Sequence, residues 1–275
     1  MRLGAKRRKG RTRAFVAAAA LVLSAAPFVI PGCAGGPPAG AVPERPPEAR
    51  SVSDGLEMIE GRGWTAVRAS VPEGGLELAL AARFDEDGRL LGGHGTDDFE
   101  DAAVEASMVG SPHHPVRFRS GLPQAVSGFF RLGGTTVSEP DGRHDALGLD
   151  EGGTPFLLRP EDQERWTGDA AGGFFAVLAD GEVLSPVDNR DAVGAVGWTD
   201  GGSTVVFFVS RGRKGSGLTY REAGEILRSL GAEDALAMDG GGSVRLAWRD
   251  GGGIVSYPDR PLYRAVPNRL VLVRR

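Results

Sequence analysis

The sequence has little of the chemistry that cysteine and histidine provide: one cysteine, Cys33, and four histidines in 275 residues. A single cysteine excludes a disulfide within the chain, and with it the class of disulfide-stabilised scaffolds. The histidines also lack the spacings that mark zinc sites. Two of them are adjacent in sequence and would face opposite sides of a strand. We therefore expect surface or structural roles for His94, His113, His114 and His144.

Acidic residues outnumber basic residues clearly once the N-terminal segment is excluded. The net charge is -4, although the first thirteen residues include Arg2, Lys6, Arg7, Arg8, Lys9, Arg11 and Arg13. Apolar residues 14–30 follow directly, in the order typical of a secretory signal, and they are shorter than the roughly 20 residues of a membrane-spanning helix. We predict an export signal at residues 1–32. Its removal leaves an acidic domain, which argues against a nucleic-acid partner.

The predicted signal ends at the single cysteine, in the order Ile30-Pro31-Gly32-Cys33. This order resembles a bacterial lipobox, which predicts an exported cell-envelope lipoprotein held on the membrane through lipidated Cys33. No aspartate follows Cys33. By resemblance to lipoprotein sorting this favours the outer membrane, with the domain facing the periplasm or the cell surface. The alternative is a buried thiol within an ordinary cleavable signal. Residues 33–53 are rich in proline and predict an extended linker to a domain over residues 54–275.

The chain is rich in the two residues that interrupt regular structure, with 43 Gly and 18 Pro. Many tight turns and few long helices favour a β-rich fold. Thr219 and Glu222 fit a capping box, which predicts one helix that ends before Gly231. We expect an α+β fold: a single catalytic-type domain with a mixed, mostly antiparallel β-sheet and few helices. Alternating or short apolar segments predict strands at residues 64–71, 76–84, 124–130, 174–178, 193–198, 205–209, 235–238 and 244–248.

The strongest candidate site is the loop Asp239-Gly240-Gly241-Gly242-Ser243. Successive glycines lose much backbone entropy on folding, and they permit a ligand to approach the backbone closely. Amides in such a loop can form an anion site beside the Asp239 carboxylate. Asp-Gly and Gly-Gly are also hairpin signals, so a plain hairpin turn is an equal alternative on spacing alone.

The order of motifs around this loop resembles the phosphodiester glycosidase family, most specifically over residues 193–273. The matching residues are Gly212-Arg213, Gly217-Leu218-Thr219 with Glu222, Leu230-Gly231-Ala232, Asp234-Ala235-Leu236, the loop at 239–243 and Arg264-Ala265-Val266-Pro267-Asn268. Ser127-Gly128-Phe129-Phe130 resembles the upstream motif of the family more weakly. The resemblance implies hydrolysis of a sugar-1-phosphodiester, of the N-acetylglucosamine-1-phosphodiester kind, in an envelope or extracellular phosphoglycan.

The resemblance also implies roles for individual residues. Asp239 is the expected catalytic carboxylate, and Glu222 is a second catalytic candidate that the helix cap already explains. Arg213 is expected to clamp phosphate oxygens, as is Arg264, although a solvated arginine and a salt bridge are the respective alternatives. The expected substrate-binding residues are Gly240, Gly241, Gly242, Ser243, Arg264, Asn268, Ser127 and Gly128, with turn capping as the alternative for Asn268.

Three positions depart from the family pattern: Ser127 replaces an Asn, Arg211 replaces an Asp and Tyr263 replaces a Glu. These departures favour the alternative function, a non-catalytic glycan-binding envelope lipoprotein on the same scaffold. A structural envelope protein without a ligand is a third class, and it predicts no pocket around Asp239. No cofactor is required by this chemistry; a divalent metal ion near Asp239 remains an open alternative.

Overall fold

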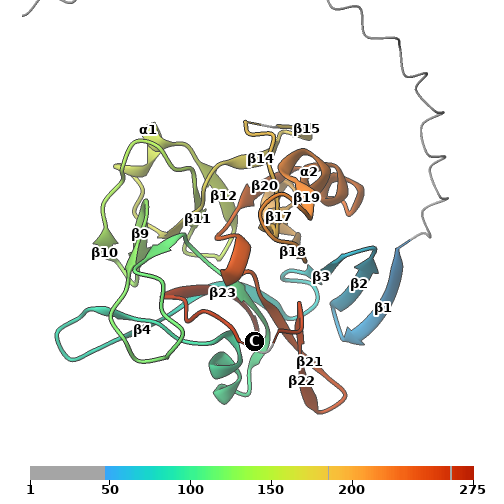
Figure 1. Ribbon diagram of the computed structural model, residues 1–275, viewed down its shortest axis with the longest axis horizontal. Helices are drawn as coiled ribbons and strands as arrows, with labels where there is room; N and C mark the ends of the chain where they lie inside the picture. The colour runs from blue at the N-terminus through green and yellow to red at the C-terminus, as the bar shows by residue number, and fades with distance from the viewer. Residues whose placement is uncertain (1–46, 185, 261) are drawn as a thin grey trace, which may run out of the picture. The chain divides into compact units, whose positions relative to one another are not determined.

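The computed structural model describes residues 47–184, 186–260 and 262–275 (Figure 1). The predicted export signal and Cys33 lie outside the described residues. Within the described part of the chain, no helix has the length and apolar character needed to cross a membrane.

Three larger sheets and two two-stranded ladders make up this region, and their strand pairs are antiparallel. The eight-stranded sheet contains β1 (Glu48–Ser53), β2 (Leu56–Gly61), β3 (Trp64–Ser70), β18 (Thr204–Ser210), β17 (Gly194–Trp198), β20 (Asp234–Ala237), β14 (Ala176–Ala179) and β15 (Glu182–Val183), in that order.

The six-stranded sheet contains β22 (Gly253–Tyr257), β21 (Leu246–Asp250), β6 (Val104–Val109), β23 (Asn268–Arg274), β4 (Leu76–Phe84) and β5 (Leu90–Leu91). The five-stranded sheet contains β10 (Thr135–Ser138), β9 (Phe130–Leu132), β13 (Asp169–Gly172), β11 (Ala146–Leu149) and β12 (Pro155–Leu158). The ladders pair β16 (Arg190–Asp191) with β19 (Leu218–Thr219), and β7 (His113–His114) with β8 (Ala125–Val126).

Helices are few and short among the described residues. They are α1 (Pro160–Gln163), α2 (Tyr220–Ser229) and the 3₁₀ segments η1 (Gly95–Glu100), η2 (Asp200–Gly202) and η3 (Gly241–Ser243). The expected mostly antiparallel β fold with few helices in one domain is confirmed, while the α+β label fits loosely because strands dominate. The predicted helix is α2, and its capping box is formed by Thr219 and Glu222.

Regular secondary structure begins before residue 54, the expected start of the domain. Strand β1 occupies residues 48–53 of the predicted linker and pairs with β2 across the Asp54-Gly55 turn. Most of its side chains are exposed, so backbone hydrogen bonds rather than an apolar pattern determine this strand.

The eight-stranded sheet is buried on both faces, as β18 shows. Val205, Phe207 and Val209 pack into the core shared with the other sheets. Val206 and Phe208 point the other way, into the core under α2. This alternation follows from the two-residue period of a strand, and a strand covered on both faces is apolar throughout.

Helix α2 covers the second face through Ala223 and Leu227, and Figure 1 shows it beside β14, β17 and β20. Gly197 of β17 permits this close approach. A Cβ there would lie 2.8 Å from the Ala232 side chain and 3.1 Å from that of Leu227. The helix in turn places its N-terminal residue, Tyr220, beside the loop that begins at Asp239.

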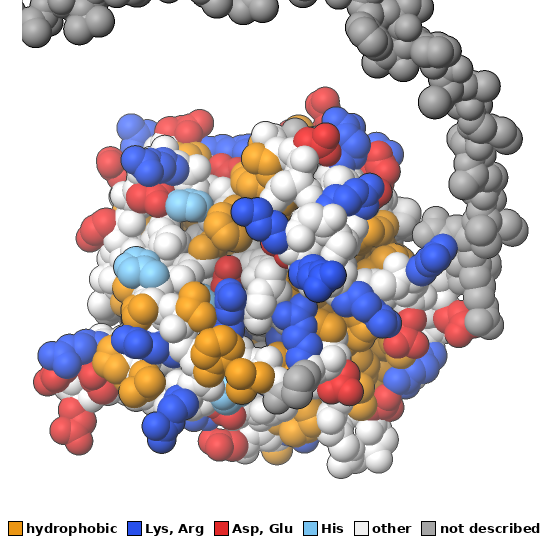
Figure 2. All heavy atoms as spheres, in the orientation of Figure 1, with side chains coloured by type: hydrophobic (Ala, Val, Ile, Leu, Met, Phe, Trp, Pro, Cys, Tyr) orange, Lys and Arg blue, Asp and Glu red, His pale blue; other side chains and the backbone are white. Residues whose placement is uncertain are grey.

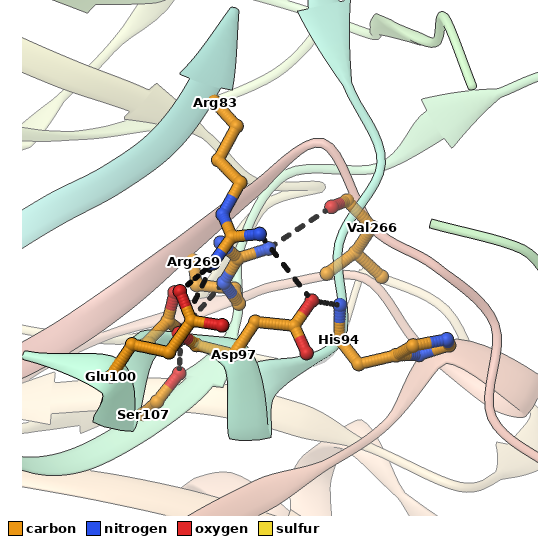
Figure 3. Close-up of polar contacts among 8 residues, drawn as sticks. Arg83, His94, Asp97, Glu100, Ser107, Val266 and Arg269 are labelled. Carbon is orange, nitrogen blue, oxygen red and sulfur yellow. Dashed lines mark hydrogen bonds and ion pairs between the residues drawn. The ribbon is translucent and has the colours of Figure 1, made fainter. Parts of the chain in front are cut away.

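A buried ion pair joins η1 to β23 (Figure 3). Arg269 Nε lies 2.6 Å from Asp98 Oδ2, and the two side chains are 1% and 5% exposed. Ser107 Oγ donates a second hydrogen bond of 2.6 Å to the same carboxylate oxygen. Arg269 also donates to the carbonyl of Val266 at 3.3 Å. A buried charge that is paired and hydrogen-bonded in this way fixes the start of β23, which follows Arg264 closely in the chain.

Candidate active site

The loop at residues 239–243 leaves one sheet and enters another. It follows β20 of the eight-stranded sheet and precedes β21 of the six-stranded sheet. Because its two flanking strands do not pair, the hairpin alternative is wrong. The Asp239 amide donates to the carbonyl of Gly110 at 3.0 Å, and the Gly241 amide donates to that of Ala192 at 2.9 Å. These bonds fix the loop between the two sheets.

A cavity of about 480 Å³ opens over this loop. Six of the residues predicted from sequence line this cavity: Arg213, Asp239, Gly240, Gly241, Gly242 and Arg264. Figure 2 shows Lys and Arg side chains near the middle of the face in view, over the region where Figure 1 labels β17 and β23. The remaining lining residues are Phe174, Asp191, Gly212, Lys214, Tyr220 and Arg260.

A buried histidine lies behind the Asp239 carboxylate. His113 Nδ1 is 3.0 Å from Asp239 Oδ2, and the side chains are 1% and 14% exposed. Neither ring nitrogen of His113 has an aligned hydrogen bond within the described residues, so the contact is a close polar approach. Of the surface and structural roles expected for the histidines, burial leaves only the structural one, or a role in the site, for His113. No local pattern links His113 to Asp239, because the two residues lie far apart in the chain.

Asp191 and Tyr220 add a second carboxylate and a phenol to the cavity. Burial, followed by the nearby charges of Asp191 and Asp239, raises the pKa of Tyr220. The hydroxyl therefore stays protonated at neutral pH and is available as a hydrogen-bond donor. Asp191 Oδ1 accepts a hydrogen bond of 2.8 Å from the amide of Ala192.

The glycines of the loop at residues 239–243 leave space for a charged side chain, and most of their amide groups are engaged within the protein. A Cβ on Gly242 would lie 2.7 Å from both Nε and Cζ of Arg264, so only glycine permits this guanidinium to rest on the loop. The Gly240 amide already donates to Asp239 Oδ1 at 2.9 Å, and the Ser243 amide donates to the Gly240 carbonyl at 3.2 Å. The amides of Gly240, Gly241 and Ser243 are therefore already engaged within the protein, and the cationic groups at the cavity are arginine and lysine side chains.

The segment that supplies Arg260 and Arg264 is held in place by Tyr263. The Tyr263 ring lies 3.9 Å below the guanidinium of Arg245, a cation–π contact. Its hydroxyl donates to the Pro258 carbonyl and accepts from the Arg260 amide at 3.2 Å. Arg260 in turn donates to the Gly241 carbonyl at 3.1 Å. Tyr263, one of the three departures from the family pattern, thus supports the cavity wall.

Several predicted site residues lie outside the cavity lining. Asn268 Oδ1 accepts from the Ser111 amide at 2.7 Å and its amide nitrogen donates to Ser111 Oγ at 3.0 Å, which is the structural role left open above. Ser127 binds the Pro112 carbonyl through its amide at 2.7 Å, and Gly128 adopts φ of 80° against His144. Ser243 is buried, and its hydroxyl has no partner among the described residues.

Glu222 is engaged away from the cavity. It accepts from the Thr219 amide at 2.8 Å and from both terminal nitrogens of Arg190, at 2.8 and 3.0 Å. Burial raises its pKa, but the hydrogen bonds from Thr219 and Arg190 outweigh burial, and the net pKa of Glu222 is lowered. The geometry fits a capping residue at the start of α2.

We predict that Glu222→Gln lowers the free energy of unfolding at pH 7 by less than about 1 kcal/mol, because the exposed ion pair is lost while the cap acceptor remains. A lowered folded-state pKa stabilises above the unfolded value and is lost as pH falls through the folded value. The difference between parent and variant should therefore shrink as the pH falls below the ordinary glutamate pKa. Urea unfolding across this pH range measures it, and a difference that does not change with pH contradicts the assignment.

A metal site near Asp239 is not supported by the donor set. Within residues 47–184, 186–260 and 262–275 there is no group of three or more His, Cys, Asp or Glu side chains arranged to hold a metal ion.

The cavity thus brings a carboxylate beside a buried histidine together with several arginines. The chain matches the family model of phosphodiester glycosidases over residues 101–273, more than half of its length. It belongs to the phosphodiester glycosidase family. No curated protein matches it at a significant level.

Solved structures share the fold. The catalytic domain of zebrafish N-acetylglucosamine-1-phosphodiester alpha-N-acetylglucosaminidase, auto-inhibited by its pro-peptide, is 17% identical, with 83% of this chain and 82% of that chain covered and a TM-score of 0.56. A Synechocystis protein of unassigned function is 13% identical, with 83% and 61% covered and a TM-score of 0.54. A Burkholderia pseudomallei protein described as exported is 13% identical, with 79% and 74% covered and a TM-score of 0.51.

Proposed function

We propose that the chain hydrolyses a sugar-1-phosphodiester, of the N-acetylglucosamine-1-phosphodiester kind, in an envelope or extracellular glycan. The observation that carries the proposal is the single cavity in which Asp239, backed by His113, faces Arg213 and Arg264. One water molecule is consumed. Its hydroxyl goes to the anomeric carbon of the released sugar, and its proton goes to the phosphate oxygen that leaves as a phosphomonoester.

Each group has a chemical role in this reaction. Asp239 acts at the anomeric carbon as the catalytic carboxylate, and the buried His113 ring, 3.0 Å away, limits its position. Arg213 and Arg264 bind the non-bridging phosphate oxygens, where planar guanidinium groups form paired hydrogen bonds. Tyr220, which keeps its proton, donates to a sugar hydroxyl or to a phosphate oxygen.

The departures from the family pattern leave this cavity intact. Neither Ser127 nor Arg211 lines it. Arg211 donates to the Tyr257 hydroxyl at 2.8 Å, and Tyr263 braces the cavity wall. The unbroken set of charged residues over the loop therefore favours hydrolysis over the binding-only alternative.

The direct test is hydrolysis of a panel of chromogenic sugar-1-phosphodiesters by the purified protein, with Arg264→Lys as the variant. We expect turnover on at least one sugar. The variant should raise KM by about tenfold or more, because a lysine cannot reproduce the two-pronged phosphate contact. Absence of turnover on every sugar, together with retained glycan binding, would support the non-catalytic lipoprotein.

We propose in addition that residues 1–32 direct export and that the acylated thiol of Cys33 holds the domain at the envelope. The order of basic, apolar and lipobox residues supports this. Metabolic labelling with a radioactive fatty acid tests it, since Cys33→Ser should abolish incorporation.

A further inference from the structure

The cavity over the glycine loop holds more positive charge than one phosphodiester requires. Its lining residues include four cations, Arg213, Lys214, Arg260 and Arg264, and two carboxylates, Asp191 and Asp239. With both carboxylates ionised, the excess is two positive charges. A phosphodiester carries one negative charge, so the excess is not matched by the scissile group alone.

These cations are not neutralised by the protein. Within the described residues, the side chains of Arg213, Lys214 and Arg264 have no hydrogen bond or ion pair. Arg260 donates only to a neutral carbonyl, that of Gly241, at 3.1 Å. Elsewhere arginines meet acids directly, as Arg269 meets Asp98 and Arg190 meets Glu222. Unpaired cations held together repel one another, and a bound anion relieves that repulsion.

The four cations come from two separate segments. Arg213 and Lys214 lie in the turn that Ser216 closes through its amide, which donates to the Arg213 carbonyl at 2.7 Å. Arg260 and Arg264 lie on the segment braced by Tyr263. In the first segment Arg213 belongs to the Gly-Arg motif and Lys214 lies outside it. In the second, Arg264 belongs to the Arg-Ala-Val-Pro-Asn motif and Arg260 lies outside it.

We propose that the substrate carries a second anionic group besides the scissile phosphodiester, and that Lys214 and Arg260 bind it. This inference rests on the proposed function and narrows the substrate class to acidic phosphoglycans. Arg213 and Arg264 bind the scissile phosphate, and the additional pair selects for the second charge. A phosphate is favoured over a carboxylate as this second group, because it offers more oxygens to a guanidinium and an ammonium.

The test compares three diesters of one sugar-1-phosphate: a methyl ester, an ester whose aglycone bears a phosphomonoester, and one whose aglycone bears a carboxylate. We expect kcat/KM for the phosphate-bearing diester to exceed that for the methyl ester by about tenfold or more at low salt, and the ratio to fall as salt rises. Lys214→Gln should reduce this ratio about fivefold. Arg165→Gln removes one positive charge from an exposed residue outside the cavity and should leave the ratio unchanged.

The outcomes separate this inference from the proposed function. Equal kcat/KM values on the methyl and both charged diesters would overturn the second-anion inference while hydrolysis itself stands. A preference for the carboxylate arm would retain the second anion and identify it as a uronate-type group.

Failure to hydrolyse all three diesters, and every sugar of the chromogenic panel, would overturn the proposed function, and calorimetric binding of inorganic phosphate and pyrophosphate then decides the inference. Pyrophosphate should bind about tenfold more tightly than phosphate in the parent and lose that advantage in Lys214→Gln. Equal affinities in the parent would overturn it.

Discussion

Asp239→Asn is expected to lower kcat on a sugar-1-phosphodiester by about a thousandfold or more, with a much smaller change in KM. The substitution removes the negative charge and the proton-accepting ability that the proposed reaction needs at the anomeric carbon. It keeps an oxygen at the Oδ1 position, so the hydrogen bond from the Gly240 amide, 2.9 Å in the parent, is retained. The loop should therefore hold its shape, and the loss reports chemistry rather than folding.

Steady-state kinetics and a thermal unfolding midpoint, measured on the same preparation, decide this prediction. His113→Asn is the informative companion, because it removes the ring that lies 3.0 Å from Asp239 Oδ2. Because His113 is a positioning residue, His113→Asn should reduce kcat less than Asp239→Asn does. It should also alter the pH profile of kcat. A variant Asp239→Asn that retains most of the parental kcat would show that another carboxylate, with Asp191 as the first candidate, performs the reaction.

Arg269→Met is expected to destabilise the domain by about 3–5 kcal/mol, because it leaves the Asp98 carboxylate buried without its counter-charge. The pair is almost fully buried, with side-chain exposures of 1% and 5%. Ser107 Oγ continues to donate to Asp98, at 2.6 Å in the parent, but a hydroxyl cannot replace a full charge. Urea unfolding at pH 7 measures the loss.

The matched control is Arg275→Met. It breaks an ion pair that also lies near the C-terminus but is exposed to solvent. Arg275 and Glu77 are 49% and 38% exposed, so the loss should be below about 1 kcal/mol. The double variant Arg269→Met with Asp98→Leu should be less destabilised than Arg269→Met alone, because no unpaired charge remains buried. Similar small losses in both single variants would argue against a structural role for the buried pair.

Local signals in the sequence were sufficient for much of the fold. Alternating apolar residues and turn glycines predicted β3, β4, β17 and β18 within a residue or two, and the capping box predicted α2. These elements depend on short-range patterns, which a sequence shows directly. The motif order also brought Asp239, its glycines, Arg213 and Arg264 to one site, which the cavity lining contains.

Other parts of the site depend on contacts that no local pattern reports. His113, Asp191 and Arg260 reach the loop only through sheet pairing and the fold of the Tyr263 segment. Strand β1 was missed because its side chains are exposed and only its backbone bonds define it. Asn268 and Glu222 match the family motif, yet both side chains are hydrogen-bonded within the scaffold and neither lines the cavity.

Strand β23 lies between β4 and β6, where Leu270 pairs with Leu80 on one side and with Met108 on the other. Most of the domain separates β23 in sequence from both partners. A chain synthesised or threaded through a pore N-terminus first therefore keeps β4 and β6 unjoined until β23 emerges. Such long-range pairing slows folding and leaves the growing chain open to chaperones for longer. The same strand carries Arg269, so the buried ion pair and the sheet depend on the same long-range pairing.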